Sequence, residues 1–167
     1  MKIGLISDTH GYLDSKIFDY TKECDEIWHA GDIGNISLLD QLENFKPLRA
    51  VFGNIDSQEI RARTSEIAFI SCGGMNIIMT HIAGKPPTYT KKIRNQLLDN
   101  QPDILVCGHS HILKVIFDKK NKILYLNPGA AGRHGFHMIK TLLRFEIDNR
   151  KIFNVEAIEI GPRAQKK

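Results

Sequence analysis

The first half of the chain alternates short apolar runs with amphipathic stretches. The runs at 3–6, 26–29 and 49–52 have the length and composition of strands, and the first is continuously apolar, as strands covered on both faces tend to be. Between them, residues 15–22 and 37–44 place apolar side chains at helical spacing. This β-α-β-α-β order predicts right-handed crossovers and a parallel sheet.

The middle of the chain changes character. Residues 67–71 and 76–80 are strand-like and flank Cys72-Gly73-Gly74-Met75, which predicts a hairpin. Pro86-Pro87 marks a loop, and residues 89–99 then predict a further helix.

The last third predicts a buried strand at 103–107 followed by a β-meander. The four runs assigned to the meander are 114–117, 123–126, 138–147 and 152–158. No repeat or linker separates the two halves, so they are expected to form one domain, residues 1–161. We expect Pro162–Lys167 to be a loose tail.

Polar residues of similar type follow five of the apolar runs. These segments are Asp8-Thr9-His10, Gly31-Asp32, Gly53-Asn54-Ile55-Asp56, His81 and Gly108-His109-Ser110-His111. In open α/β sheets, side chains beyond the carboxyl ends of strands converge on a ligand site from distant points of the sequence. The glycines of these segments allow the backbone to turn tightly and approach a bound ion.

The converging side chains offer only nitrogen and oxygen ligands. Carboxylates and imidazoles suit manganese, iron, zinc, cobalt or nickel, whereas a cysteine-rich set would favour structural zinc. A carboxylate can bridge two cations and hold them roughly 3.5–4 Å apart. We therefore expect two divalent metal ions, with manganese as the leading candidate. The candidate ligands are Asp8, His10, Asp32, Asn54, His81, His109 and His111.

In the order and spacing of these segments, the chain resembles the calcineurin-like metallophosphoesterases. Its small size and Asn127-Pro128-Gly129 are similar to the compact YfcE-type branch, which contains phosphodiesterases. The resemblance implies an α/β fold of two mixed β-sheets packed as a sandwich and flanked by helices, in four layers. It implies a first metal held by Asp8, His10, Asp32 and His111, and a second held by Asp32 (as bridge), Asn54, His81 and His109.

One position departs from the pattern of the larger family. That family often carries a histidine directly after the metal-binding asparagine, where it protonates the leaving group, but here the residue is Ile55. A missing general acid typically costs about 10²–10⁴-fold in rate, and less when the leaving group departs as a stable anion. Because the compact branch commonly lacks this histidine, the departure indicates a restricted choice of substrate. No protein side chain is therefore assigned as catalytic, and a hydroxide bridging the two metals is expected to attack phosphorus.

Three further residues are candidates for contacting the substrate. Asn35 would hydrogen-bond a phosphate oxygen or fix its own loop, and Arg133 has the geometry to grip a phosphate oxygen unless its Gly-rich segment is only a solvated loop. His134 is the third candidate, although the spacing of His134 and His137 is more typical of packing or surface histidines. His29 is expected to support a ligand or to pack in the core.

Charge and cysteine content bound the remaining possibilities. The 167 residues carry a formal net charge of +4. Since Arg163, Lys166 and Lys167 contribute three of those charges, the folded body is near +1, which argues against nucleic acid as a partner. Cys24, Cys72 and Cys107 have no paired spacing, so we expect free thiols and a cytoplasmic location.

No apolar run has the roughly 18–20 residues of a membrane span, so no membrane association is expected. The leading hypothesis is a phosphodiesterase acting on a small phosphodiester or phosphorylated substrate. The sequence leaves open whether the chain forms homo-oligomers. The alternative is a non-catalytic scaffold, because a retromer subunit uses the same fold as an interaction surface. A nuclease is a third, weaker hypothesis.

Overall fold

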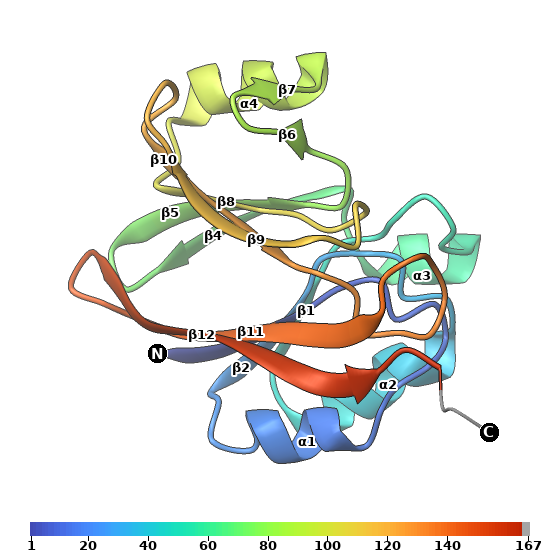
Figure 1. Ribbon diagram of the computed structural model, residues 1–167. Coiled ribbons are helices and arrows are strands. Elements are labelled where there is room, and N and C mark those ends of the chain that lie inside the picture. Colours follow the sequence, from blue (N-terminus) through green and yellow to red (C-terminus); the bar gives the residue numbers. More distant parts are fainter. Residues whose placement is uncertain (165–167) are drawn as a thin grey trace.

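A computed structural model describes residues 1–164 and contains two five-stranded mixed β-sheets that face one another (Figure 1). The first sheet has the strand order β12-β11-β1-β2-β3. Its strands are β1 (Lys2–Ile6), β2 (Glu26–His29), β3 (Leu48–Ala50), β11 (Ile139–Asp148) and β12 (Lys151–Pro162). β1, β2 and β3 are parallel, as the sequence predicts, and β11 runs antiparallel to β1.

The second sheet has the order β4-β5-β8-β10-β9. Its strands are β4 (Ile67–Cys72), β5 (Met75–Thr80), β8 (Ile104–Val106), β9 (Leu113–Asp118) and β10 (Ile123–Pro128). β5, β8 and β10 are parallel, and an antiparallel strand closes each edge. Each sheet therefore contains three neighbouring parallel strands, whose carboxyl ends are free to carry polar loops.

Helices cover the outer faces of the two sheets (Figure 1). The first sheet carries α1 (Lys16–Thr21), α2 (Ile36–Phe45) and α3 (Gln58–Arg63), and the second carries α4 (Lys91–Asn100). Three apolar cores separate the layers. Ile3, Leu5 and Trp28 belong to the core between the sheets, Leu39 to the core under α2, and Ile93 to the core under α4. The expected four-layer sandwich is confirmed.

The predicted β-meander is wrong. β9 and β10 form a hairpin in the second sheet, whereas β11 and β12 form a hairpin in the first, so the chain changes sheets after β10. The four runs look alike locally, and sheet membership depends on long-range pairs such as Leu5 with Leu143. Local sequence patterns carry no information about such long-range pairs.

Two elements were not predicted. Residues 58–63 form α3, which Ser57 caps by accepting a hydrogen bond from the backbone N–H of Ile60. The Pro86-Pro87 loop contains a small hairpin, β6 (Gly84–Lys85) with β7 (Thr88–Tyr89). The helix predicted from residue 89 accordingly begins later, after its cap Thr90.

Part of the predicted C-terminal tail continues the sheet. Pro162 closes β12, and the backbone N–H of Arg163 donates to the carbonyl of Met138 at 3.0 Å. Residues 165–167 of that predicted tail lie outside the described residues.

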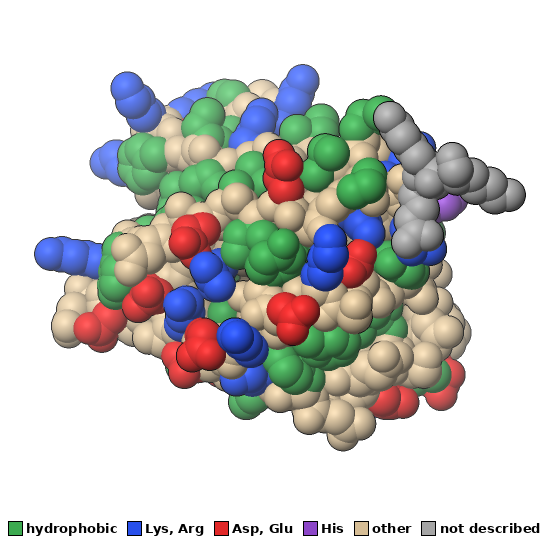
Figure 2. Space-filling view, turned by 60° about the horizontal axis from the view of Figure 1, so that its bottom comes forward, with side chains coloured by type: hydrophobic (Ala, Val, Ile, Leu, Met, Phe, Trp, Pro, Cys, Tyr) green, Lys and Arg blue, Asp and Glu red, His purple; other side chains and the backbone are tan. Residues whose placement is uncertain are grey.

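Charges of both signs are interspersed on the face of the molecule drawn in Figure 2. The surface carries ion pairs such as Arg144 with Glu156 at 2.7 Å. Cys24, Cys72 and Cys107 are buried and free, which confirms the expectation of unpaired thiols. Within residues 1–164, no helix has the length and apolar character needed to cross a membrane.

Candidate metal centre

The loops that follow β1, β2, β5 and β8 meet at one edge of the sandwich. The backbone N–H groups of Asp8 and His10 donate to the carbonyls of Gly31 and Asp32, each at 3.0 Å. The N–H of Gly108 donates to the carbonyl of His81 at 3.1 Å. These bonds tie the loops of each sheet to one another. The backbone N–H of His109 donates to Oδ2 of Asp8 at 3.0 Å and so joins the loops of the two sheets.

Asp8, His10 and His111 form a first acid–histidine group. Their candidate ligand atoms all lie within 4.8 Å of one another. The Nε2 atom of His111 is 3.1 Å from Oδ1 of Asp8 and 3.4 Å from Nε2 of His10. Asp8 is fully buried and the two histidines are partly exposed, so the group faces outward from the sheet edge. Such a cluster of one carboxylate and two imidazoles suits a divalent transition-metal ion.

Asp32, His81 and His109 form a second acid–histidine group beside the first. The Nε2 atom of His81 is 3.2 Å from Oδ1 of Asp32. The other carboxylate oxygen of Asp32, Oδ2, is 3.7 Å from Nε2 of His10, which belongs to the first group. The two oxygens of Asp32 are therefore shared between the groups, as a bridging carboxylate requires.

Three buried side-chain atoms of the candidate ligands have no hydrogen-bond partner among the described residues: Oδ1 of Asp8, Nε2 of His81 and Nδ1 of His111. The first two of these atoms lie 4.0 Å apart. The other ring nitrogen of His81, Nδ1, is 2.8 Å from the carbonyl of Ala30 and donates to it, which leaves the Nε2 lone pair directed at the carboxylates. Because unpaired buried polar atoms are costly, this pattern fits residues arranged around a cation.

Burial and the two carboxylates have opposite effects on the protonation of these histidines. Burial lowers the pKa of His10 in spite of the neighbouring carboxylates of Asp32 and Asp8, which favours the neutral imidazole that a metal needs. Burial also opposes protonation of His81, but its contact with Asp32 outweighs that effect and raises the pKa of His81. For Asp32, burial is outweighed by the close contact with the His81 ring, which lowers the pKa, so the carboxylate stays ionised.

The candidate ligands share an unusual backbone conformation. Five of them have positive φ angles: Asp8 (54°), His10 (48°), Asp32 (54°), His109 (65°) and His111 (56°). This left-handed region is uncommon for residues other than glycine and costs of order 1–3 kcal/mol per residue. Such strain clusters at functional sites.

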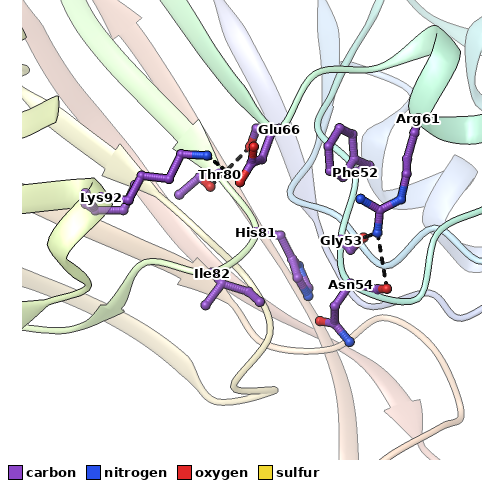
Figure 3. A pocket seen from close by; sticks show the side chains of 10 residues that line it. Phe52, Gly53, Asn54, Arg61, Glu66, Thr80, His81, Ile82 and Lys92 are labelled. Atoms are coloured by element: carbon purple, nitrogen blue, oxygen red, sulfur yellow. Dashed lines mark hydrogen bonds and ion pairs between the residues drawn. The ribbon is translucent and has the colours of Figure 1, made fainter.

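Glycines permit the close approach of these loops. A Cβ atom on Gly53 would collide with the carboxylate of Asp32, so the loop that carries Asn54 lies directly against the second group. Gly31 has a φ of +95°, and a Cβ there would stand 2.7 Å from the His81 side chain. Asn54 is exposed and lines the same cavity as His81 (Figure 3), in keeping with its predicted place beside this group.

Asp56 holds two of the loops together. Its buried carboxylate accepts hydrogen bonds from three backbone N–H groups, those of Ile33 (3.1 Å), Gly34 (2.7 Å) and Gly53 (2.7 Å). The acid at the end of the Gly-Asn-x-Asp segment thus orients backbone around Asp32 and Asn54. Ile55, at the position of the family's histidine, is exposed and carries no ionisable group.

Two supporting residues were not identified from the sequence. Arg61 on α3 donates to the carbonyls of Asp56, Gly53 and Asn54, and so clamps the Asn54 loop. The side-chain amide of Asn127 donates to the carbonyl of Gly108 at 2.8 Å and fixes the loop that carries His109 and His111. A half-buried arginine on a short helix gives no sequence signal, whereas Asn127 stood in a recognised motif without an assigned contact.

His29 is completely buried and connects the loops that follow β1 and β2. Its Nδ1 accepts from the N–H of Gly31 at 3.2 Å, and its Nε2 lies 2.9 Å from the hydroxyl of Thr9. This arrangement fits a neutral ring with the proton on Nε2. Burial lowers the pKa of His29 to about 4, so the ring stays neutral near pH 7.

The candidate substrate contacts lie at the border of the site. Arg133 stacks on the ring of Tyr12, with its guanidinium carbon 3.8 Å from the ring centroid, and Nη2 donates to the Tyr12 hydroxyl at 2.8 Å. The ring centroid of His134 is 4.9 Å from that of His10. Asn35 accepts from the N–H of Ser37 and thereby caps α2, the loop-fixing role that was one of its two expected roles.

His137 does not contact the ligand atoms through its hydrogen bonds. It is nearly buried, its Nε2 lies 3.0 Å from the carbonyl of Gly132, and its ring centroid is 5.2 Å from that of His111. The residue packs behind His111, which fits the expectation that the His134–His137 spacing is not itself a metal motif.

Comparison with known proteins adds the family. The family model described as "Calcineurin-like phosphoesterase superfamily domain" matches residues 1–150. A probable metallophosphoesterase of Methanothermobacter thermautotrophicus is 30% identical over 139 residues, which cover 78% of this chain and 77% of the relative.

Solved structures match the fold over nearly its whole length. An archaeal phosphodiesterase superposes with a TM-score of 0.77 at 18% identity and covers 96% of this chain and 100% of its own. Zinc-bound Vps29 of Entamoeba histolytica superposes with a TM-score of 0.72, also at 18% identity, and covers 98% of this chain and 100% of its own. The match over residues 1–150, together with two acid–histidine groups at the strand ends, shows that this chain belongs to the calcineurin-like metallophosphoesterase superfamily.

Proposed function

We propose that this protein is a metal-dependent phosphodiesterase that binds two divalent cations at the two acid–histidine groups, with manganese as the leading candidate for both. The observation that carries the proposal is the position of Asp32, whose carboxylate oxygens lie 3.2 Å from His81 and 3.7 Å from His10. The unpartnered Oδ1 of Asp8 and Nε2 of His81 support it, because a bound cation would satisfy both.

The candidate ligands fall into two sets that share Asp32. Asp8, His10 and His111 would hold one cation, while His81, His109 and Asn54 would hold the other, with Asp32 between them. Two cations bound there would neutralise the charge of a phosphodiester and supply a hydroxide nucleophile near neutral pH. Since Ile55 cannot give a proton to the departing oxygen, esters whose leaving group is a stable anion are the favoured substrates.

The test begins with protein purified without chelator. We expect two equivalents of metal per chain by mass spectrometry and hydrolysis of bis(p-nitrophenyl) phosphate that increases with added Mn²⁺. Asp32→Asn is expected to lose metal and to lower kcat/KM by at least about 100-fold, since removal even of a residue that only supports a ligand costs about 10–100-fold. Asp40→Asn, a change of the same kind at an exposed acid on α2, is the matched control.

Full metal content and activity in Asp32→Asn would overturn the proposal. The competing function is an interaction scaffold, in keeping with the Vps29 structures that share this fold. A chain that stays inert with every divalent ion but copurifies with a stable partner would favour the scaffold. The complete donor set argues for the enzyme, because a scaffold has no need of two acids and four histidines around a common centre.

A further inference from the structure

A cavity of about 280 Å³ opens beside the second acid–histidine group (Figure 3). His81 of that group and Asn54 line it, so a molecule held at the metal centre would extend into it. The cavity is close to the lower end of the usual size of ligand pockets, and it therefore suits one ring system rather than a whole substrate. Its other lining residues are Phe52, Gly53, Arg61, Glu66, Thr80, Ile82, Lys92 and Ile93.

Apolar side chains provide much of the wall. Phe52 lies on one side of the cavity and Ile82 on the other, as Figure 3 shows, and the buried Ile93 of α4 contributes as well. Ile82 is 41% exposed in spite of its size. Covering an exposed isoleucine and a partly exposed phenylalanine with an apolar group lowers the free energy, because it removes apolar surface from water.

The two positively charged side chains that line the cavity, Lys92 and Arg61, already have hydrogen-bond acceptors. Lys92 pairs with Glu66 at 2.5 Å. The guanidinium carbon of Arg61 is 4.3 Å from the Phe52 ring centroid, and Arg61 donates through Nε and Nη2 to three backbone carbonyls. A second phosphate would have to break these interactions, which argues against a polyanionic ligand.

Donor groups nevertheless remain at the border of the cavity. Nη1 of Arg61 has no hydrogen-bond partner in the described part of the chain, and the ammonium of Lys92 has donors beyond the one that Glu66 accepts. The cavity thus combines an apolar wall with N–H donors at its edge, and Arg61 is held rigid by its backbone contacts.

We propose that this cavity binds a flat aromatic ester group of the substrate, with hydrogen-bond acceptors on the ring edge that faces Arg61 and Lys92. Phe52 and Ile82 would cover the faces of the ring while the phosphoryl group lies at the acid–histidine groups. This inference rests on the proposed function, because it needs the phosphoryl group to be anchored there. It assigns selectivity for aryl or heteroaryl phosphoesters to residues that take no part in metal binding.

The test compares three hydrolysis-resistant ligands that carry a single substituent: methylphosphonate, phenylphosphonate and 4-nitrophenylphosphonate. Calorimetric titration of the Mn²⁺-loaded protein measures their affinities without any turnover. Phenylphosphonate is expected to bind about 10–100-fold more tightly than methylphosphonate, because a whole ring is buried. The nitro group, an acceptor at the ring edge, is expected to add about threefold to tenfold.

Variants separate the contributions. Phe52→Leu keeps an apolar side chain but removes the flat ring, and Ile82→Ala removes the opposite wall at an exposed position where folding is not at stake. Both are expected to reduce the preference for phenyl over methyl at least threefold. Lys92→Ala is expected to reduce only the extra affinity of the nitro group. Lys91→Ala, a neighbouring exposed lysine of α4 that does not line the cavity, is the control.

Equal affinities for the phenyl and methyl ligands would overturn the inference, as would a ring preference that neither Phe52→Leu nor Ile82→Ala reduces. If bis(p-nitrophenyl) phosphate is hydrolysed while no ring preference exists, the cavity assignment fails and the proposed function stands. If the ring preference is clear but no hydrolysis occurs, the cavity assignment stands and the proposed phosphodiesterase activity fails. If none of the three phosphonates binds, both proposals are overturned.

Discussion

Two parts of the border of this site are built in different ways. The anchored loops, residues 8–11, 31–34 and 53–56, are joined by backbone hydrogen bonds and by the buried side chains of His29 and Asp56. The stacked segment, residues 133–138, lies against the same site mainly through ring contacts. Its Phe136 and Met138 side chains are 70% and 77% exposed.

The difference separates holding an ion from contacting a substrate. Candidate ligands in the anchored loops adopt left-handed backbone conformations, a strain that persists only where surrounding bonds fix the chain. Arg133 and His134 instead rest on Tyr12 and His10, and such exposed stacking leaves the side chains free to adapt. Metal geometry requires the first kind of support, whereas a substrate that must enter and leave is better served by the second.

The largest expected effect concerns Asp56, the centre of the anchored loops. Asp56→Asn turns an acceptor of three backbone N–H groups into a side chain whose own NH₂ must face at least one of them. Buried groups left unpaired cost about 1–3 kcal/mol each. We expect the free energy of unfolding to fall by about 3–5 kcal/mol, measured by urea denaturation in the presence of chelator.

The control for this change is Asp40→Asn. Asp40 is an exposed acid that pairs with Arg63 at 2.6 Å, and surface pairs of this kind contribute about 0–1 kcal/mol. If Asp56→Asn and Asp40→Asn had the same small effect, the anchored loops would not depend on Asp56, and the contrast with the stacked segment would fail.

A second, smaller effect comes from the neutral His29 between two anchored loops. Burial lowers its pKa to about 4, whereas an unfolded histidine has a pKa near 6.5. Below pH 6.5 the unfolded chain therefore binds a proton that the folded chain does not, so this contribution is complete above pH 6.5 and is lost as the pH falls towards 4. The loss amounts to about 2–3 kcal/mol at pH 4.5.

The measurement is urea unfolding of metal-free protein at pH 7 and pH 4.5. His29→Gln removes the titrating ring, so its stability should fall less over this interval than that of the unchanged chain. His134→Gln, which changes an exposed histidine of the stacked segment, should keep the original pH dependence. Identical pH dependence in His29→Gln and the unchanged chain would show that the buried ring is not held neutral.

The sequence predicted the anchored loops far better than it predicted the stacked segment. Asp8 and Asp32 follow neighbouring parallel strands, whose carboxyl ends must meet at one edge, so local pattern was sufficient for this pair. His81 follows β5 of the other sheet, and its approach to Asp32 depends on how the two sheets pack. The sheet that β11 joins depends on pairs such as Leu5 with Leu143, which no local pattern encodes.

Supporting contacts show the same division. The three bonds of Arg61 to backbone carbonyls depend on the position of α3, an element that six residues without a strong apolar period did not reveal. Arg133 was identified as a candidate from its type and its Gly-rich surroundings, but its stacking on Tyr12 joins residues 121 positions apart. Composition and spacing indicate which side chains are present, and long-range packing decides what they contact.

The smallest expected effect on stability belongs to Arg133, in the stacked segment. Because its guanidinium and Tyr12 form an exposed stack, Arg133→Ala should lower the free energy of unfolding by less than about 1 kcal/mol. If Arg133 grips a phosphate oxygen throughout the reaction, one of the two roles expected from the sequence, the change should raise KM for bis(p-nitrophenyl) phosphate about tenfold with little change in kcat. Arg150→Ala, at the exposed β11–β12 turn away from the site, should leave KM unchanged. An unchanged KM in Arg133→Ala would remove the substrate contact, and a loss of stability as large as that of Asp56→Asn would place Arg133 among the anchoring residues and end the distinction between the two regions.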